Sequence, residues 1–169
     1  MRKLHQQAFG EHGEVVSDLV DGLRALVGAG HGVSLVVEEA GDIVGHVMLI
    51  DALLDAPRRL VTVRVLSPLA VLPSRQGQGI GRALVTAGLQ HESTRGVPVV
   101  FLEGDPGYYS RLGFEPGASH SFCKPSLRIP DAAFQAVLLP SYQPWMTSTL
   151  VYPDVFWRHD AVGLRDPGT

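Results

Sequence analysis

A run of small residues between an apolar strand and an amphipathic helix constrains this chain more than any other stretch. Residues 61–72 are mostly apolar and lead into Pro73, after which glycine takes alternate positions: Gly77, Gly79 and Gly81. An amphipathic stretch follows over residues 80–91, so the pattern predicts a strand, a glycine loop and a helix. Glycine lets the backbone approach a ligand closely, and the first amides of a helix are unpaired and lie at the positive end of its dipole. The sequence therefore predicts an anion-binding loop.

Two phosphate-binding motifs fit this loop poorly. A P-loop needs Lys and then Ser or Thr after its last glycine, but Arg82 and Ala83 follow here. A dinucleotide fingerprint needs glycine where Arg82 stands. Residues 76–81, which follow the apolar residues 69–71, match a third pattern, Gln/Arg-x-x-Gly-x-Gly/Ala. Taken alone, this hexapeptide is also compatible with a simple glycine-rich turn.

A second motif lies beyond the next apolar run, residues 97–102. Asp105 and Pro106 are suited to the N-cap and the first position of a short helix, which Gly113 would end. The same stretch reads Tyr-Tyr-x-x-x-Gly-Phe over residues 108–114. A strand, a helix and a strand in this order form a right-handed crossover, so the strands on either side of the glycine loop and its helix should be parallel.

With both motifs in this order, the chain resembles the GCN5-related N-acetyltransferases, the GNAT superfamily, over residues 11–156. The sequence around the second motif is similar to that of a bacterial subgroup of predicted acetyltransferases called YhbS-like. The resemblance implies an α/β (α+β) fold. Its central sheet should be mixed and mostly antiparallel, with about six to seven strands, a splayed parallel pair and flanking helices.

The periodicity predicts a helix over residues 11–27 and a hairpin with its turn at residues 40–42. Residues 1–9 make a poor strand, so the first strand of the family is expected to be missing or replaced. Residues 1–169 are expected to form a single GNAT acetyltransferase domain in which residues 158–169 fray. The other expected elements are a helix over 80–94 and strands over 33–39, 43–50, 60–72, 97–102, 134–139 and 147–152.

Composition excludes several classes of protein. The chain has 169 residues and a formal net charge of −3, which gives no reason to expect nucleic acid or membrane as a partner. No apolar run approaches the roughly 20 residues of a membrane helix, and the N-terminus lacks an apolar signal core. The single cysteine, Cys123, excludes an internal disulfide and fits a cytoplasmic protein. If the chain associates, a homodimer is the expected assembly.

The resemblance implies that acetyl-CoA is the cosubstrate. Backbone N–H groups at the helix start should hold its pyrophosphate, and the Arg82 side chain adds positive charge. The extended pantetheine arm should pair with the backbones of Leu69 and Val71 like an added strand. Backbone donors near Leu69 or Ala70 could stabilise the oxyanion of the tetrahedral intermediate. The expected cofactor-binding residues are Leu69, Ala70, Val71, Gln76, Gly77, Gln78, Gly79, Ile80, Gly81 and Arg82.

Tyr109 matches the tyrosine that serves the family as general acid toward the CoA thiolate. Its alternative is a buried tyrosine whose hydroxyl is satisfied locally. Glu103 leads as the base that takes the proton of the amine, with Asp105, Glu39, His46 or water as alternatives. His46 could also be an ordinary histidine on a half-solvated strand. No metal is expected, because no His-x-x-x-His or paired ligand spacing occurs.

The leading hypothesis is an N-acetyltransferase that acts on a primary amine of a small molecule or protein, by direct attack within a ternary complex. An acyl-CoA-binding sensor, or a degenerate GNAT domain without turnover, is a second hypothesis. The third is a structural domain in which the glycines only form a turn. The presence of Tyr109 favours the enzyme.

Overall fold

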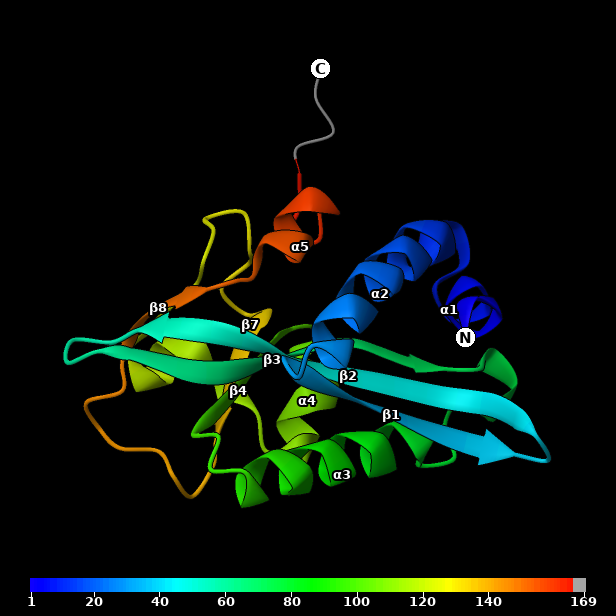
Figure 1. Ribbon diagram of the computed structural model, residues 1–169, viewed down its shortest axis with the longest axis horizontal. Coiled ribbons are helices and arrows are strands. Elements are labelled where there is room, and N and C mark those ends of the chain that lie inside the picture. The colour runs from blue at the N-terminus through cyan, green and yellow to red at the C-terminus, as the bar shows by residue number, and fades with distance from the viewer. Residues whose placement is uncertain (166–169) are drawn as a thin grey trace. The chain divides into compact units, whose positions relative to one another are not determined.

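A computed structural model describes residues 1–165 of the protein (Figure 1). The chain forms two compact units, and each is described by itself. The first contains residues 1–50 and 66–95, and the second contains residues 51–65 and the chain from residue 96 on. Strands β2 (Asp42–Asp55) and β3 (Leu60–Val71) each contribute to both units.

The first unit begins with two helices packed side by side, α1 (Arg2–Phe9) and α2 (Gly13–Gly28), joined by a 3₁₀ turn over residues 10–12. Helix α2 forms because apolar residues recur at spacings of three and four and bury one face. Residues 2–9, which make a poor strand by sequence, form the helix α1. A helix thus stands in place of the first strand of the family. The predicted helix over 11–27 is confirmed from Gly13 onward.

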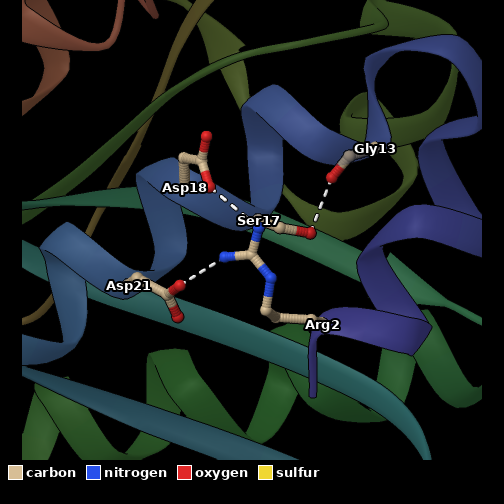
Figure 2. A network of polar contacts seen from close by, with 5 residues as sticks. All are labelled: Arg2, Gly13, Ser17, Asp18 and Asp21. Carbon is tan, nitrogen blue, oxygen red and sulfur yellow. Dashed lines mark hydrogen bonds and ion pairs between the residues drawn. The ribbon is translucent and has the colours of Figure 1, made fainter.

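Polar contacts and one close backbone approach join these two helices. The guanidinium of Arg2 pairs with Asp18 at 2.8 Å and also with Asp21, both on α2 (Figure 2). Within α2 itself, Ser17 donates a hydrogen bond to the Gly13 carbonyl oxygen at 2.6 Å. A Cβ on Gly13 would lie 2.5 Å from the Gln6 Cα, so the backbones of α1 and α2 meet where Gly13 has no side chain.

Strand β1 (Gly32–Glu39) pairs antiparallel with β2, from Gly32 opposite Ile50 to Glu39 opposite Asp42. Ala40 and Gly41 both have positive φ, as a two-residue hairpin turn requires, which confirms the predicted hairpin. Successive residues of β2 face opposite sides of the hairpin. Gly45 faces α3 (Ile80–Thr94), where a Cβ would meet the Ile80 side chain at 2.7 Å, and the next residue, His46, contacts α1. Helices thus cover both faces of this hairpin.

The second unit carries the strand order β5-β7-β4-β3-β2-β8-β6. Strand β4 (Val99–Glu103) pairs parallel with β3, at Arg64 opposite Val100 and Val65 opposite Phe101, which confirms the predicted parallel pair. The splaying of these strands beyond Val65 stays a prediction. The remaining strands are β5 (Glu115–Pro116), β6 (Phe122–Cys123), β7 (Phe134–Leu138) and β8 (Ser148–Val151).

The described residues thus form eight strands, including β1, in a mixed and mostly antiparallel sheet flanked by helices, as predicted but with one strand more. The core of the second unit centres on Phe101, which is fully buried. Its ring packs edge-on against Phe122 at 4.8 Å and stacks on Phe134 at 5.7 Å.

Asp105 and Gly113 bound the short helical stretch, as predicted. The Asp105 carboxylate accepts a hydrogen bond from the Gly107 N–H at 2.8 Å, α4 (Pro106–Tyr109) continues into a 3₁₀ turn over residues 110–112, and Gly113 has φ of 92°. A further helix that the sequence did not reveal, α5 (Asp154–Arg158), follows β8.

The stretch 158–169, where fraying is expected, contains Val162, which is 1% exposed. Residues 166–169 lie outside the described residues. No helix within residues 1–165 combines the length and the apolar composition needed to cross a membrane.

Candidate functional site

The glycine loop of the first unit is open. Residues 73–79 are exposed, and Gly77 and Gly79 have φ of 73° and 84°, a region that disfavours residues with a side chain. Apart from the neighbouring residues, no described atom lies within 4 Å of the place where a Cβ of either glycine would stand. The loop therefore presents bare backbone with room beside it.

Helix α3 begins directly after this loop. Gly79 is its N-cap, and the Ala83 N–H donates to the Gly79 carbonyl at 3.0 Å. The N–H groups of residues 80–82 precede this bond and have no acceptor within the helix. The exposed Arg82 adds a guanidinium beside them. Backbone donors, a positive helix end and one cation together suit a phosphate-type anion.

Side chains of the loop brace it rather than cover it. The Gln76 amide donates to the Val71 carbonyl at 3.2 Å, and the Gln78 amide donates to the Ser74 carbonyl at 3.3 Å. Arg75 pairs with Glu39 on β1 at 2.7 Å. The glutamine of the motif thus ties the loop back to the end of β3, and Glu39, one of the alternative bases, is engaged in an ion pair.

The last residues of β3 lead into the loop. Ala70 is buried, whereas Leu69 and Val71 are partly exposed, as expected for alternate faces of a strand. Just past the strand, the Leu72 N–H donates to the Val44 carbonyl of β2 at 2.9 Å. The role of the Leu69 and Val71 backbones toward pantetheine stays a prediction.

A carboxylate with two donors occupies the second unit. Glu103 ends β4, and its Oε2 accepts a hydrogen bond from the Tyr152 hydroxyl at 2.8 Å while its Oε1 accepts one from the Gly163 N–H at 2.8 Å. Burial raises the pKa of Glu103, against the opposing effect of these two donors and of Arg128. Burial also raises the pKa of Tyr152 well above its ordinary value, so this phenol stays protonated and donates.

Tyr109 ends α4, with its ring over the backbone of Gly104. A Cβ on Gly104 would lie 2.5 Å from the ring, and the Phe114 ring packs edge-on at 5.7 Å. Within residues 1–165 the Tyr109 hydroxyl has no hydrogen-bond partner. Burial, and then Tyr108, raises the pKa of Tyr109 to about 12. The phenol is therefore protonated at neutral pH, as a general acid must be.

Two other alternative bases have structural tasks. Asp105 caps α4. His46 is neither on a half-solvated face nor free to accept a proton from a substrate, because it is fully buried. Its Nδ1 lies 2.9 Å from His5 Nε2 on α1, and its Nε2 lies 2.8 Å from the Ser34 hydroxyl on β1. The prediction that placed His46 on a half-solvated strand was wrong because α1, which covers this residue, was not recognised.

The protonation of this histidine pair follows from its surroundings. His5 Nδ1 is buried without a hydrogen-bond partner in residues 1–165. Burying an unprotonated ring nitrogen without a partner costs less free energy than burying an unpaired N–H, so Nδ1 carries no proton. His5 Nε2–H then donates to His46 Nδ1, and His46 Nε2–H donates to Ser34. Burial is the main reason that the pKa of each histidine falls to about 4, so both are neutral.

Sequence reasoning missed three residues that the structure joins to the candidate site residues: Tyr152, Gly163 and Arg128. Of the three, only Tyr152 lies in an element expected from the sequence, the strand over residues 147–152. No group of three or more His, Cys, Asp or Glu side chains suited to a metal ion occurs within residues 1–165.

The fold agrees with that of known proteins. The family model for the acetyltransferase (GNAT) domain matches residues 30–116, so the chain belongs to the GNAT acetyltransferase family. The uncharacterized N-acetyltransferase YjhQ of Escherichia coli K12 is 36% identical over 118 residues, which are 70% of this chain and 64% of YjhQ. The uncharacterized N-acetyltransferase YhbS of the same strain is 46% identical over 55 residues, 32% of this chain and 33% of YhbS. The matched parts thus span less than two thirds of either relative.

Solved structures extend the likeness over nearly the whole chain. The crystal structure of E. coli YhbS in complex with CoA has a TM-score of 0.79 and 28% identity, and covers 93% of this chain and 84% of that one. A GNAT family acetyltransferase from Brucella melitensis in complex with acetyl-CoA has a TM-score of 0.69 and 30% identity, and covers 92% of this chain and 88% of that one.

Proposed function

We propose that this protein transfers the acetyl group of acetyl-CoA to a primary amine of a small molecule or protein, by direct attack within a ternary complex. The observation that carries the proposal is the open glycine loop at the start of α3, whose backbone donors suit a diphosphate. The complexes of YhbS with CoA and of the Brucella protein with acetyl-CoA support it. A cytoplasmic location, a single domain and a homodimer stay predictions.

The proposed binding roles follow the chain. N–H groups of residues 78–82 hold the pyrophosphate, and the Arg82 side chain adds charge. Gly77 and Gly79 keep the loop in its left-handed conformation, and Gln76 braces it. The Leu69 and Val71 backbones pair with the pantetheine amides, and a donor near Leu69 or Ala70 stabilises the oxyanion.

The chemistry needs two proton carriers and no covalent intermediate on the protein. Glu103, as carboxylate, takes a proton from the substrate ammonium. The amine nitrogen then attacks the thioester carbonyl, and collapse of the tetrahedral intermediate breaks the C–S bond. The attacking nitrogen gives up its second proton to solvent, and the leaving thiolate takes the Tyr109 hydroxyl proton. The products are therefore the acetamide and CoA, and solvent then takes the proton from Glu103 and returns one to Tyr109.

Two measurements test the proposal. Calorimetric titration with CoA should show saturable binding, and its absence would refute both the enzyme and the sensor hypotheses. Thiol release from acetyl-CoA should then depend on an added amine, in a screen of polyamines, amino acids, aminoglycosides and peptides. Saturable CoA binding with no amine-dependent release across the screen would favour the acyl-CoA sensor instead.

A further inference from the structure

Glu103 receives its two hydrogen bonds from distant parts of the sequence. Tyr152 is 49 residues away and Gly163 is 60 residues away, yet each donates to a different carboxylate oxygen at 2.8 Å. A partly buried carboxylate is costly to keep ionised unless donors compensate for lost water. A carboxylate has about four acceptor positions, so two donors leave Glu103 able to accept a proton.

The Gly163 donor is held in place by contacts on both sides. Val162 is buried, and its carbonyl accepts a hydrogen bond from Arg128 Nη1 at 2.5 Å. The Leu164 N–H donates to the Arg128 carbonyl at 3.1 Å. Gly163 has φ of 61°, and a Cβ there would lie 2.6 Å from the Arg128 carbonyl carbon, so glycine fits where another residue would collide. The contacts of Val162, Gly163 and Leu164 thus hold the Gly163 N–H in position to donate to Glu103.

The Tyr152 donor is fixed as firmly. Its side chain is almost fully buried, and its ring packs against Phe156 at 5.2 Å and Trp157 at 6.4 Å. The ring therefore cannot swing away, and the hydroxyl has a defined direction toward Glu103.

We propose that the C-terminal segment 162–164 and Tyr152 belong to the acetyl-transfer machinery as positioning groups, which orient Glu103 and keep it ionised as the base for the amine. This inference rests on the proposed function. The charged and titratable groups that act on Glu103 are Tyr152 and Arg128, and Arg128 also holds the segment. A segment that merely anchored the end of the chain would change stability but not the protonation of Glu103.

The test compares Tyr152→Phe and Gly163→Ala with a matched control. Phe keeps the ring and removes the donor, and Ala displaces the Gly163 N–H by collision. Gly30→Ala is the control, because Gly30 also has a positive φ, 88°, but has open space around it. Glu103→Gln assigns the Glu103 carboxyl signal in a ¹³C NMR titration, and the pH dependence of kcat/KM is measured for each variant.

Removing a donor destabilises the carboxylate, so the pKa of Glu103 should rise. In both variants we expect the acidic limb of kcat/KM and the NMR titration of Glu103 to move to higher pH by about one unit or more. Gly30→Ala should leave both unchanged. Should Gly163→Ala fail to fold, Tyr152→Phe decides the question alone.

The outcomes separate the inference from the function on which it rests. Wild-type turnover with unmoved pH profiles in the variants would overturn the inference and leave the acetyltransferase standing. Wild-type protein without amine-dependent turnover would overturn the proposed function and, with it, the role of Glu103 as a base.

Discussion

At the scale of one residue, Gly79 shows how anion binding by the loop depends on positions that carry no side chain. We expect Gly79→Glu to weaken CoA binding at least about a hundredfold, because it forces a side chain onto φ of 84° and sets a carboxylate against a diphosphate. Isothermal titration calorimetry with CoA checks this. The matched control is Gly41→Glu in the β1–β2 turn, which has φ of 87° and open space, and which should bind CoA normally. An equal loss of CoA affinity in both variants would mean that backbone strain, rather than a side chain in the glycine loop, causes the loss.

Tyr109 allows a second test at this scale. Tyr109→Phe should lower kcat about a hundredfold or more, since the phenol is the proposed donor to the thiolate, while CoA affinity stays nearly unchanged. Tyr142→Phe is the control, because Tyr142 also belongs to the second unit and packs against an aromatic ring, that of Phe122. Steady-state kinetics and CoA titration give the two readouts. A parallel fall in kcat and CoA affinity would assign Tyr109 a structural role.

At the scale of the elements, the contact between α1 and α2 depends on Gly13. A Cβ there would lie 2.5 Å from the Gln6 Cα, and backbone cannot yield as a flexible side chain can. We expect Gly13→Ala to lower the free energy of unfolding by about 1–3 kcal/mol, measured by urea denaturation. Gly28→Ala in the same helix meets no atom within 4 Å and should be neutral or stabilising. A neutral Gly13→Ala would show that the helices separate at little cost.

The elements also show what a sequence can and cannot predict. The glycine loop, helix α3 and the Asp105 cap were predictable, because their signals lie within a few neighbouring residues. Helix α1 was not, since only Leu4 and His5 of its eight residues are buried and the apolar period is too short to detect. The two donors to Glu103 lie 49 and 60 residues away from it, and His5 lies 41 residues from His46, so no local pattern encodes these pairs.

The stability of the molecule as a whole should depend on pH through the buried His5–His46 pair. The pKa of each falls from 6.5 to about 4 on folding, so the unfolded chain binds more protons between these values. Stability is therefore complete above pH 6.5 and is lost as the pH falls toward 4. We expect the free energy of unfolding to decrease by a few kcal/mol between pH 7 and pH 5, as measured by urea denaturation.

Variants of two histidines isolate this effect. His46→Gln should flatten the pH dependence between pH 7 and pH 5, because it removes one titrating ring and breaks the pair. His12→Gln changes an exposed histidine and should keep the wild-type slope. Carboxylates titrate mainly below this window, so an unchanged slope in His46→Gln would show that other groups cause the acid sensitivity.

The hydrogen bond from Gly163 to Glu103 also has a consequence for biosynthesis. A ribosome releases Glu103 60 residues before Gly163, so β4 can pair with its neighbours while one oxygen of this carboxylate still faces water. The nascent chain can therefore complete the hydrogen bonding of Glu103 only after Gly163 has left the ribosome.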